Sequence, residues 1–410
     1  MDRLALHGGR PVRDRPFPDR ALFGEEAERL VVQTLRRGWL YGPGGPMMAS
    51  LERRFAQLYG AAHAVACSSG TAAIHLALAA LDFEPGSEII TAPITDAGTI
   101  VPIIYQHAVP VFVDVDEHYG MDPADIERKI TDRTAAILAV HLFGSGSDMR
   151  EICEVADRHG IAVLEDCSQA HVTRLDGRYL GRWGHVGAFS LQQSKHMTTG
   201  DGGVVITDDD AAAERMRLFR DKGWERGRHG ARSYPMLGLN YRMTELQAAV
   251  GVPQIAGVRA IVERRASLGA RLASRLAAVD GLRPHTPIPG CEHSYWLFAF
   301  EVDGWDAEGF AAALRAEGVP AAPGYTGKPI YECMSALAER RTFGSSGYPF
   351  SGGDGRPAVT YGPGLCPVAE GVLRRQVTVW PNEAFAEEDI DDLAAAIEKV
   401  ATLLARAVSG

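Results

Sequence analysis

The chain has 410 residues and a net charge of −10, and 46% of its residues are hydrophobic against 23% charged. Because a chain of this length is too long for a single hydrophobic core, one large and one smaller domain are expected. The composition is that of a folded globular protein, and the acidic balance argues against nucleic acid as a partner. No apolar stretch approaches the roughly 20 residues that cross a bilayer. The first residues lack an apolar signal segment, so we expect a cytoplasmic protein without membrane contact.

The cysteines give no sign of a cross-linked or metal-binding fold. The chain has six, and none forms a Cys-x-x-Cys pair, so neither a disulfide framework nor a zinc site is predicted. We expect reduced, mostly buried thiols and no metal site. The cysteines are Cys67, Cys153, Cys167, Cys291, Cys333 and Cys366.

From about residue 60 to 210, short β-rich runs alternate with helical segments. Several runs are apolar almost throughout, as in strands that helices cover on both faces. This alternation is typical of an α/β domain with a mainly parallel sheet, which binds ligands beyond the carboxyl ends of its strands. The expected strands are 63–67, 88–93, 109–115, 135–142, 161–165, 186–191 and 203–207, with helices that include 71–81, 123–129 and 149–159.

The second half of the chain has a different pattern. Residues 210–280 are expected to be helical and to end in a long amphipathic run over 258–278. The stretch HSYWLFAFEVD is then β-like, and helices follow near 307–317 and over 387–408.

We place a domain boundary near residue 280. The prediction is a large domain over 1–280, including an N-terminal arm, and a smaller C-terminal α+β domain over 281–410. A stretch rich in Gly, Pro and Ser at 343–365 is expected to be a loop. Whether this loop faces a substrate stays open.

The first chemical motif is VACSSGTAAIHLALAAL, in which a small-residue turn joins a strand to a helix. The free N–H groups at the helix start, with the hydroxyls of Ser69 and Thr71, would form an anion pocket. Gly70 would let the backbone approach a phosphate closely. The alternative interpretation is an ordinary N-cap and turn.

The second motif is IAVLEDCSQAH, where Asp166 follows an apolar strand. A carboxylate at the ligand-binding edge of a sheet requires a cationic partner or several donors. A pyridinium nitrogen would be such a partner, and Gln169 could reach the same ligand. Alternatively, Asp166 caps the next helix.

The third motif is FSLQQSKHMTTGDGGVVITDD, where Lys195 lies between two apolar strands. A lysine in a dry pocket loses proton affinity and becomes a nucleophile for carbonyls, whereas an ordinary lysine is solvated. A phosphate cradle, a carboxylate and this lysine follow separate strands of one sheet in that order. They meet the requirements of an enzyme of fold-type I that uses pyridoxal 5'-phosphate (PLP).

Taken together, these motifs resemble the DegT/StrS group of sugar and aminocyclitol aminotransferases. The resemblance covers nearly the whole chain. It rests on SSGTAAIHLAL, VFVDVD, VHLFG, EDCSQAH, GAFSLQQSK, TTGDGGVVITDD, GLNYRMTELQAAVG and CPVAEG.

The resemblance implies a fold-type I PLP-dependent transferase and a role for each matching residue. Lys195 would bond covalently to the cofactor, and Asp166 would pair with its pyridine nitrogen. Gln169 would lie near the 3-hydroxyl. Gly70, Thr71 and Ser190 would hold the phosphate.

One further residue implies an assembly. Asn240, in GLNYRMTE, matches an asparagine that reaches the phosphate of the neighbouring subunit in this family. The resemblance therefore implies a homodimer with two shared active sites.

The sequence departs from the group at one position. Asp96, in APITDAGT, occupies a slot where the family usually has an aromatic residue stacked on the cofactor ring. Asp96 is retained among the cofactor-site candidates, and two interpretations stay open: a contact to the substrate, or a turn residue.

The implied reaction is transfer of an amino group from glutamine or glutamate to a keto-cyclitol or keto-sugar, in aminoglycoside, other secondary-metabolite or deoxysugar biosynthesis. The leader LALHGGRPV resembles the start of members that act on keto-cyclitols or related carbocycles. Specificity is expected to lie in Asp96, the 293–296 region and the 343–365 loop. The segment HSYWLF is otherwise interpreted as a buried edge strand.

The sequence bears on four other functions. A PLP-dependent dehydratase of this group would carry histidine in place of Lys195, whereas here His196 is the next residue. An aromatase that keeps the lysine stays open. A non-catalytic PLP-binding regulator is disfavoured by the intact Lys195 and Asp166. A nucleotide-binding oxidoreductase would require a G-x-G-x-x-G after the first strand, which the chain lacks.

Overall fold

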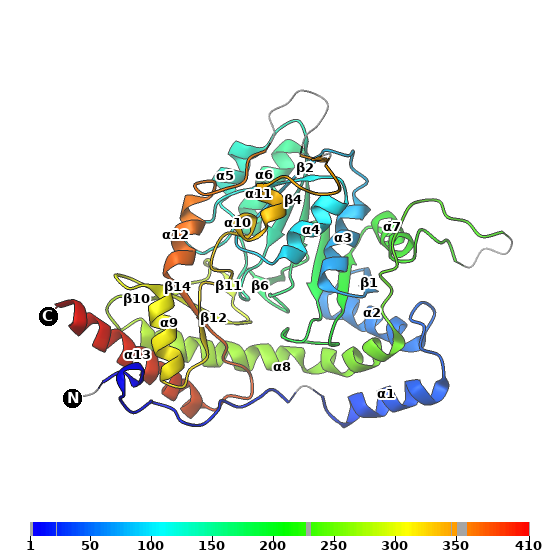
Figure 1. The fold of residues 1–410 in the computed structure, drawn as a ribbon. Helices are drawn as coiled ribbons and strands as arrows, with labels where there is room; N and C mark the ends of the chain where they lie inside the picture. Colours follow the sequence, from blue (N-terminus) through cyan, green and yellow to red (C-terminus); the bar gives the residue numbers. More distant parts are fainter. Residues whose placement is uncertain (1–2, 22, 227–230, 346, 351–358, 410) are drawn as a thin grey trace.

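A seven-stranded sheet forms the centre of the fold in the computed structural model (Figure 1). Its strand order is β1-β9-β8-β5-β4-β2-β3, and only β9 runs against its neighbours. The described residues are 3–21, 23–226, 231–345, 347–350 and 359–409. The strands of this sheet are β1 (His63–Cys67), β2 (Glu88–Thr91), β3 (Val109–Phe112), β4 (Thr134–Val140), β5 (Ala162–Asp166), β8 (Val186–Ser190) and β9 (Gly203–Thr207).

Helices cover both faces of this sheet, because successive strand residues point to opposite sides. In β1, Ala64 and Ala66 belong to the core under α2, α6 and α8, whereas Val65 and Cys67 belong to the core under α3 and α7. The helices in chain order are α1 (Glu25–Arg37), α2 (Pro46–Tyr59), α3 (Gly70–Ala80), α4 (Ala97–Tyr105), α5 (Pro123–Lys129), α6 (Met149–His159), α7 (Asp210–Arg220) and α8 (Glu245–Leu276).

The predicted α/β class and all seven predicted strands are confirmed, with strand ends within three residues of those expected. Continuous apolar runs were sufficient because these strands are buried on both faces.

The expectation of helix throughout 210–280 is wrong between α7 and α8. In the described part of 221–244 the chain forms turns and isolated bridges. Gly223 adopts a left-handed φ of +73°, and Pro235 lies within the same connection. The helix restarts at a capping box in which Thr244 and Gln247 bond to each other's backbone N–H groups.

A second sheet lies in the C-terminal part, with the order β10-β12-β14-β13. All of its pairings are antiparallel, and α9 and α13 bury their apolar faces against it and the end of α8. The strands are β10 (Leu282–Pro284), β12 (Phe298–Val302), β13 (Ala321–Pro323) and β14 (Gln376–Val379). The helices are α9 (Ala307–Ala316), α10 (Ile330–Cys333), α11 (Ser335–Ala338), α12 (Pro367–Arg375) and α13 (Glu387–Ser409).

The N-terminal arm lies against this C-terminal part (Figure 1). Its short 3-10 helix η1 (Ala5–His7) contacts α9, and Arg13 pairs with Asp389 at 2.8 Å. A third, small sheet consists of β6 (Arg174–Leu175), β7 (Arg178–Tyr179) and β11 (Cys291–Glu292). It pairs the segment between β5 and β8 of the large sheet with the segment between β10 and β12 of the second sheet. The division into 1–280 and 281–410 stays a prediction.

Two further features bear on the expectations from sequence. The described residues of 343–365 contain neither helix nor strand, as expected of a loop, and 346 and 351–358 lie outside the described residues. Within the described chain, no helix combines the length and apolar character that spanning a membrane requires.

Candidate active site

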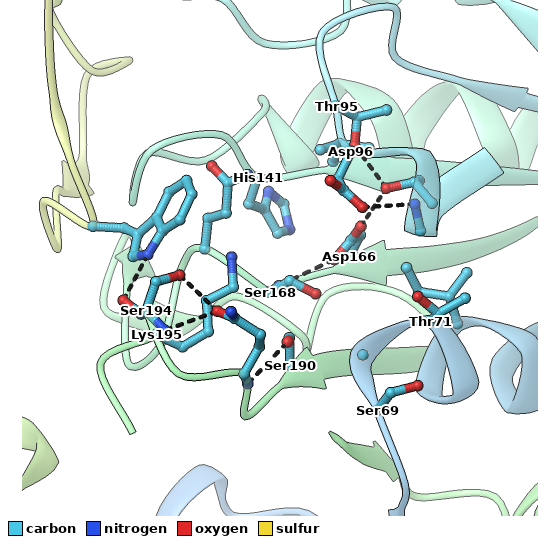
Figure 2. A pocket seen from close by; sticks show the side chains of 18 of the residues that line it. Ser69, Thr71, Thr95, Asp96, His141, Asp166, Ser168, Ser190, Ser194 and Lys195 are labelled. Atoms are coloured by element: carbon cyan, nitrogen blue, oxygen red, sulfur yellow. Dashed lines mark hydrogen bonds between the residues drawn. The ribbon is translucent and has the colours of Figure 1, made fainter. Parts of the chain in front are cut away.

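A cavity of about 370 Å³ opens where the parallel strands of the large sheet end (Figure 2). Eight of the nine residues predicted for the site line it. The lining comes from the segments that follow β1, β2, β4, β5 and β8, together with two aromatic side chains from the C-terminal part. The predicted residues among them are Ser69, Gly70, Thr71, Asp96, Asp166, Gln169, Ser190 and Lys195.

The start of α3 offers unpaired donors to the cavity. The Ser69 hydroxyl accepts from the Ala72 N–H at 3.0 Å, so the N-cap interpretation is correct for this side chain. The N–H groups of Gly70 and Thr71 have no acceptor within the described chain. A Cβ at Gly70 would lie 2.6 Å from the Ser190 Cβ, so only glycine lets β8 bring its terminal hydroxyl this close.

Asp166 is the last residue of β5, and it is 5% exposed. Its Oδ2 accepts from the Thr99 hydroxyl at 2.8 Å, and its Oδ1 accepts from the Ser168 N–H at 3.0 Å. Thr99 is held in turn by the Thr95 hydroxyl at 2.6 Å. A turn follows β5 here, so the interpretation of Asp166 as the cap of a following helix is wrong. Two donors leave this buried carboxylate able to accept a third, charged one.

Lys195 lies in the turn between β8 and β9, 8% exposed. Burial lowers the pKa of its amine to about 8, and the charges of Asp166 and Asp96 partly oppose that shift. The Nζ atom lies 3.8 Å from the centroid of the Trp296 ring. The amine therefore combines partial neutrality near physiological pH with a fixed position, the properties of a nucleophilic lysine.

Trp296 and Tyr325 form a wall that comes from the C-terminal part of the chain. The sequence predicts a specificity role for the 293–296 segment without a particular contact for Trp296, and it carries no signal for Tyr325. Interpretation of HSYWLF as an edge strand is wrong, because β12 starts only at Phe298 and is paired on both sides by β10 and β14. The Trp296 indole faces the cavity instead, next to Ser194 and Lys195.

Gln169 is fixed between the backbone that follows β4 and Tyr325 of this wall. Its amide oxygen accepts from the Phe143 N–H at 2.8 Å, and its Nε2 donates to the Tyr325 hydroxyl at 3.0 Å. Burial raises the pKa of Tyr325 well above its ordinary value, so its hydroxyl stays protonated. Gln169 thus presents a fixed amide edge to the cavity.

Asp96 and Asn240 differ in position from the other candidates. Asp96 is the N-cap of α4, its Oδ1 accepting from the Gly98 N–H at 2.7 Å, and its side chain is exposed to the cavity. Asn240 is exposed and forms an isolated antiparallel β-bridge with Asp221 through the backbone. It is absent from the described lining of the cavity. A single chain therefore does not bring Asn240 to the site.

One buried cluster beside the cavity has metal-binding side chains, namely His141, Glu165 and Cys167. The His141 Nε2 lies 3.0 Å from a Glu165 oxygen. The same carboxylate accepts from backbone N–H groups, which leaves its oxygens occupied and favours a structural role. These donors are Gly181, Trp183 and Gly184, at 2.7, 2.8 and 2.7 Å.

The donors present fit PLP. Free N–H groups and the Ser190 hydroxyl suit a phosphate, Asp166 suits a protonated ring nitrogen, and the dry Lys195 amine suits an aldehyde. The cavity volume also lies within the range of small-molecule sites. The chemistry of this donor set is therefore that of a PLP enzyme.

Comparison with known proteins gives the same result. Residues 22–343 match the DegT/DnrJ/EryC1/StrS aminotransferase family. The chain is 34% identical to an L-glutamine:2-deoxy-scyllo-inosose aminotransferase of Streptoalloteichus tenebrarius, covering 97% of both chains. It is 34% identical to a UDP-N-acetyl-3-dehydro-alpha-D-glucosamine 3-aminotransferase of Acidithiobacillus ferrooxidans, covering 85% of this chain and 87% of the other.

Among solved structures, a 3-amino-5-hydroxybenzoic acid synthase superposes with a TM-score of 0.84 at 26% identity, over 95% of this chain and 100% of that one. The fold and the cofactor predicted from sequence are thereby confirmed. The chain belongs to the DegT/DnrJ/EryC1/StrS aminotransferase family of PLP-dependent enzymes.

Proposed function

We propose that this enzyme moves an amino group from L-glutamine or glutamate to the carbonyl of a keto-cyclitol or keto-sugar. The observation that carries the proposal is the buried Lys195 amine in one cavity with the held carboxylate of Asp166. The substrate class is supported by a relative, named for glutamine and 2-deoxy-scyllo-inosose, that is 34% identical over nearly the whole chain.

The proposed roles follow from the position of each side chain. PLP, when bound, joins covalently to amines and withdraws electrons from a bond at the carbon next to the nitrogen. Lys195 would supply the amine that holds the cofactor, and its Nζ, once released, would accept the proton that leaves the donor's α-carbon. Asp166, held by Thr99 and Ser168, would keep a proton on the ring nitrogen. Trp296 and Tyr325 exclude water from one side.

The phosphate and the 3-hydroxyl have separate candidates. The N–H groups at the start of α3 and the Ser190 hydroxyl suit the phosphate, which is an anion at a helix N-terminus. Ser69 contributes through its cap, which fixes the direction of those N–H groups. Gln169 lies beside the cavity with its amide already oriented, which suits a contact to the ring hydroxyl.

The charge of the lining favours a neutral or cationic acceptor over a nucleotide-linked one. Its acidic side chains are Asp96, Asp166 and Asp201, and Lys195 is the one lysine or arginine among the described lining residues. A bound phosphate would add further negative charge. A diphosphate linker would meet this field unfavourably, so we propose a keto-cyclitol and assign Asp96 a contact to its polar groups.

The test is the visible absorption of the purified protein with PLP, wild type beside Lys195→Ala. Wild type is expected to absorb at about 410–430 nm, to lose this band toward about 330 nm with glutamine, and to regain it with the correct keto acceptor. Keto-cyclitols and nucleotide keto-sugars would be compared as acceptors. A band that survives Lys195→Ala unchanged would remove Lys195 as the anchor and the proposal with it.

A second candidate reaction has one observation in its favour. The solved structure with a TM-score of 0.84 is named a synthase of an aromatic amino acid, so aromatisation of a carbocycle is a chemistry compatible with this fold. In the absorption experiment, an aromatising enzyme would release an aromatic product from its carbocyclic substrate without any amino donor.

The cellular setting and the assembly are also proposals. We propose a homodimer in which Asn240 reaches the phosphate of the partner's site, and a role in secondary metabolism such as antibiotic biosynthesis. The exposed position of Asn240 supports the first proposal, and the aminocyclitol relative supports the second. The cytoplasmic location stays a prediction.

A further inference from the structure

The turn that carries Lys195 is held from behind by the N-terminal arm. Arg20 donates from Nη1 to the Lys195 carbonyl at 2.8 Å and from Nη2 to the His196 carbonyl at 3.1 Å. Its side chain is 14% exposed. Hydrogen bonds from a charged donor are stronger than those between neutral groups, so one arginine fixes two successive carbonyls on the C-terminal side of the Lys195 Cα.

Arg265, on α8, holds the opposite wall in the same way. Its Nη1 donates to the Trp296 carbonyl at 3.2 Å and to the Tyr295 carbonyl at 3.4 Å. Tyr295 has a φ of +46°, in the left-handed region that bulky residues rarely adopt. Such a conformation is strained and persists only where its surroundings enforce it. The buried Arg265 guanidinium is one of the groups that enforce it.

Glu383 joins the two arginines. Its Oε1 accepts from Arg20 at 2.7 Å, and its Oε2 accepts from Arg265 at 2.7 Å. Burial would raise the pKa of Glu383, but the two guanidinium groups outweigh burial and hold it below its ordinary value. The bridging carboxylate therefore stays charged.

The walls that these residues hold also bond to each other. The Trp296 indole N–H donates to the Ser194 carbonyl at 3.0 Å, and the same ring faces the Lys195 Nζ. Ser194 and Trp296 also line a second cavity of about 610 Å³, together with Arg20 and Arg265, and Lys195 is absent from its described lining. The closed contact between Ser194 and Trp296 thus separates the amine from this open space.

We propose that Arg20, Glu383 and Arg265 are positioning residues that keep the Lys195 turn closed on Trp296, so that a dry amine faces the cofactor. The inference rests on the proposed role of Lys195. It also joins three distant parts of the chain to the reacting atom: the N-terminal arm, α8 and the segment before α13.

The experiment follows attachment of PLP to the cofactor-free protein. The rate at which the band near 410–430 nm appears is measured across pH, and borohydride reduction with peptide mass analysis confirms the site as Lys195. Glu383→Gln and Arg20→Ala are expected to let water reach the amine and move the midpoint of the pH profile upward by about one unit. Attachment at pH 7 then slows about tenfold.

A cofactor-free readout and a matched control complete the test. The pH dependence of Lys195 acylation in the same variants is expected to shift in the same direction. Arg271→Ala removes another arginine of α8, which pairs at 2.8 Å with Asp391 of α13 and is 42% exposed, and it is expected to change neither profile. If Arg20→Ala does not fold, Arg20→Lys is the second variant. It keeps a positive charge beside Glu383 but can donate to fewer backbone carbonyls, so it should shift both pH profiles in the same direction.

Wild-type midpoints in Glu383→Gln and in the Arg20 variant would overturn the inference. That result is distinct from failure of the proposed function, in which Lys195→Ala would retain the absorption band.

Discussion

The chemistry proposed for this enzyme rests on a lysine and a carboxylate that are both buried but differ in their hydrogen bonding. Lys195 is dry and faces an indole ring, whereas Asp166 is buried but accepts two hydrogen bonds. Burial therefore disfavours charge on the lysine, whereas two hydrogen-bond donors hold the aspartate's oxygens in place. The site thus combines an amine of lowered proton affinity with a fixed carboxylate, as PLP chemistry requires.

The low proton affinity of Lys195 predicts a pH-dependent cost in stability. Burial lowers its pKa to about 8, so between about pH 8 and 10.4 the unfolded chain binds the extra proton and the free energy of unfolding rises with pH. Lys195→Met removes this dependence. Without cofactor, the variant should be more stable than wild type at pH 7 by up to roughly 3 kcal/mol, and the gap should close by about pH 10. Urea unfolding at both pH values measures it, and a gap independent of pH would contradict a dry lysine.

Substitution of Thr99 tests how far the binding of PLP by Asp166 depends on the hydrogen-bond donors of this carboxylate. Thr99→Val removes the hydroxyl that bonds Oδ2 at 2.8 Å and leaves a buried charge with one donor. Because such a bond contributes about 1.5–3 kcal/mol, PLP affinity of the cofactor-free protein should fall about tenfold or more. Thr34→Val removes another buried hydroxyl, bonded to the Leu30 carbonyl at 2.8 Å in α1, and should leave PLP affinity unchanged. Equal affinities for the two variants would show that Thr99 does not support Asp166.

At the scale of elements, the site depends on the close approach of α3 and β8. Gly70→Ala would place a Cβ 2.6 Å from that of Ser190, so the helix start must move away from the strand end. We expect a loss of about 1–3 kcal/mol in stability and weaker phosphate binding. Gly257→Ala on α8 meets no atom within 4 Å and should be neutral or stabilising by up to about 1 kcal/mol. Thermal unfolding and PLP titration of both variants test this, and a neutral Gly70→Ala would be the contrary result.

The sequence predicted the elements that follow local patterns and missed those that depend on distant packing. Lys195 and Asp166 could be found because each follows an apolar strand at the ligand-binding edge. The segment of Trp296 could be predicted as a specificity region but its contact with Lys195 could not, and Tyr325 could not be predicted at all, since both reach the cavity from the C-terminal part of the chain. The composition of the connection before α8 favours helix, and no break in its pattern marks the left-handed turn at Gly223. Pro253 lies inside α8 without ending it, because packing against α1 and α2 outweighs local propensity.

At the scale of the whole molecule, the proposed homodimer predicts that two different inactive chains can complement each other. In a mixture of Lys195→Ala and Asn240→Asp chains, a heterodimer contains one site with both wild-type residues. Random pairing should restore about a quarter of the wild-type activity from two preparations that are separately inactive or weak. If Asn240 serves its own chain or neither, mixing will restore nothing. Each variant mixed with itself under the same conditions is the control.

The arrangement around Trp296 also gives the enzyme a built-in optical reporter. Its indole lies 3.8 Å from the atom to which the proposed cofactor bonds, so light energy absorbed by that ring will pass to any chromophore attached there. Emission from Trp296 should therefore fall as the site fills and recover as the chromophore changes during turnover. Trp296→Phe would identify this signal among the six tryptophans, and occupancy could then be followed by fluorescence without a label.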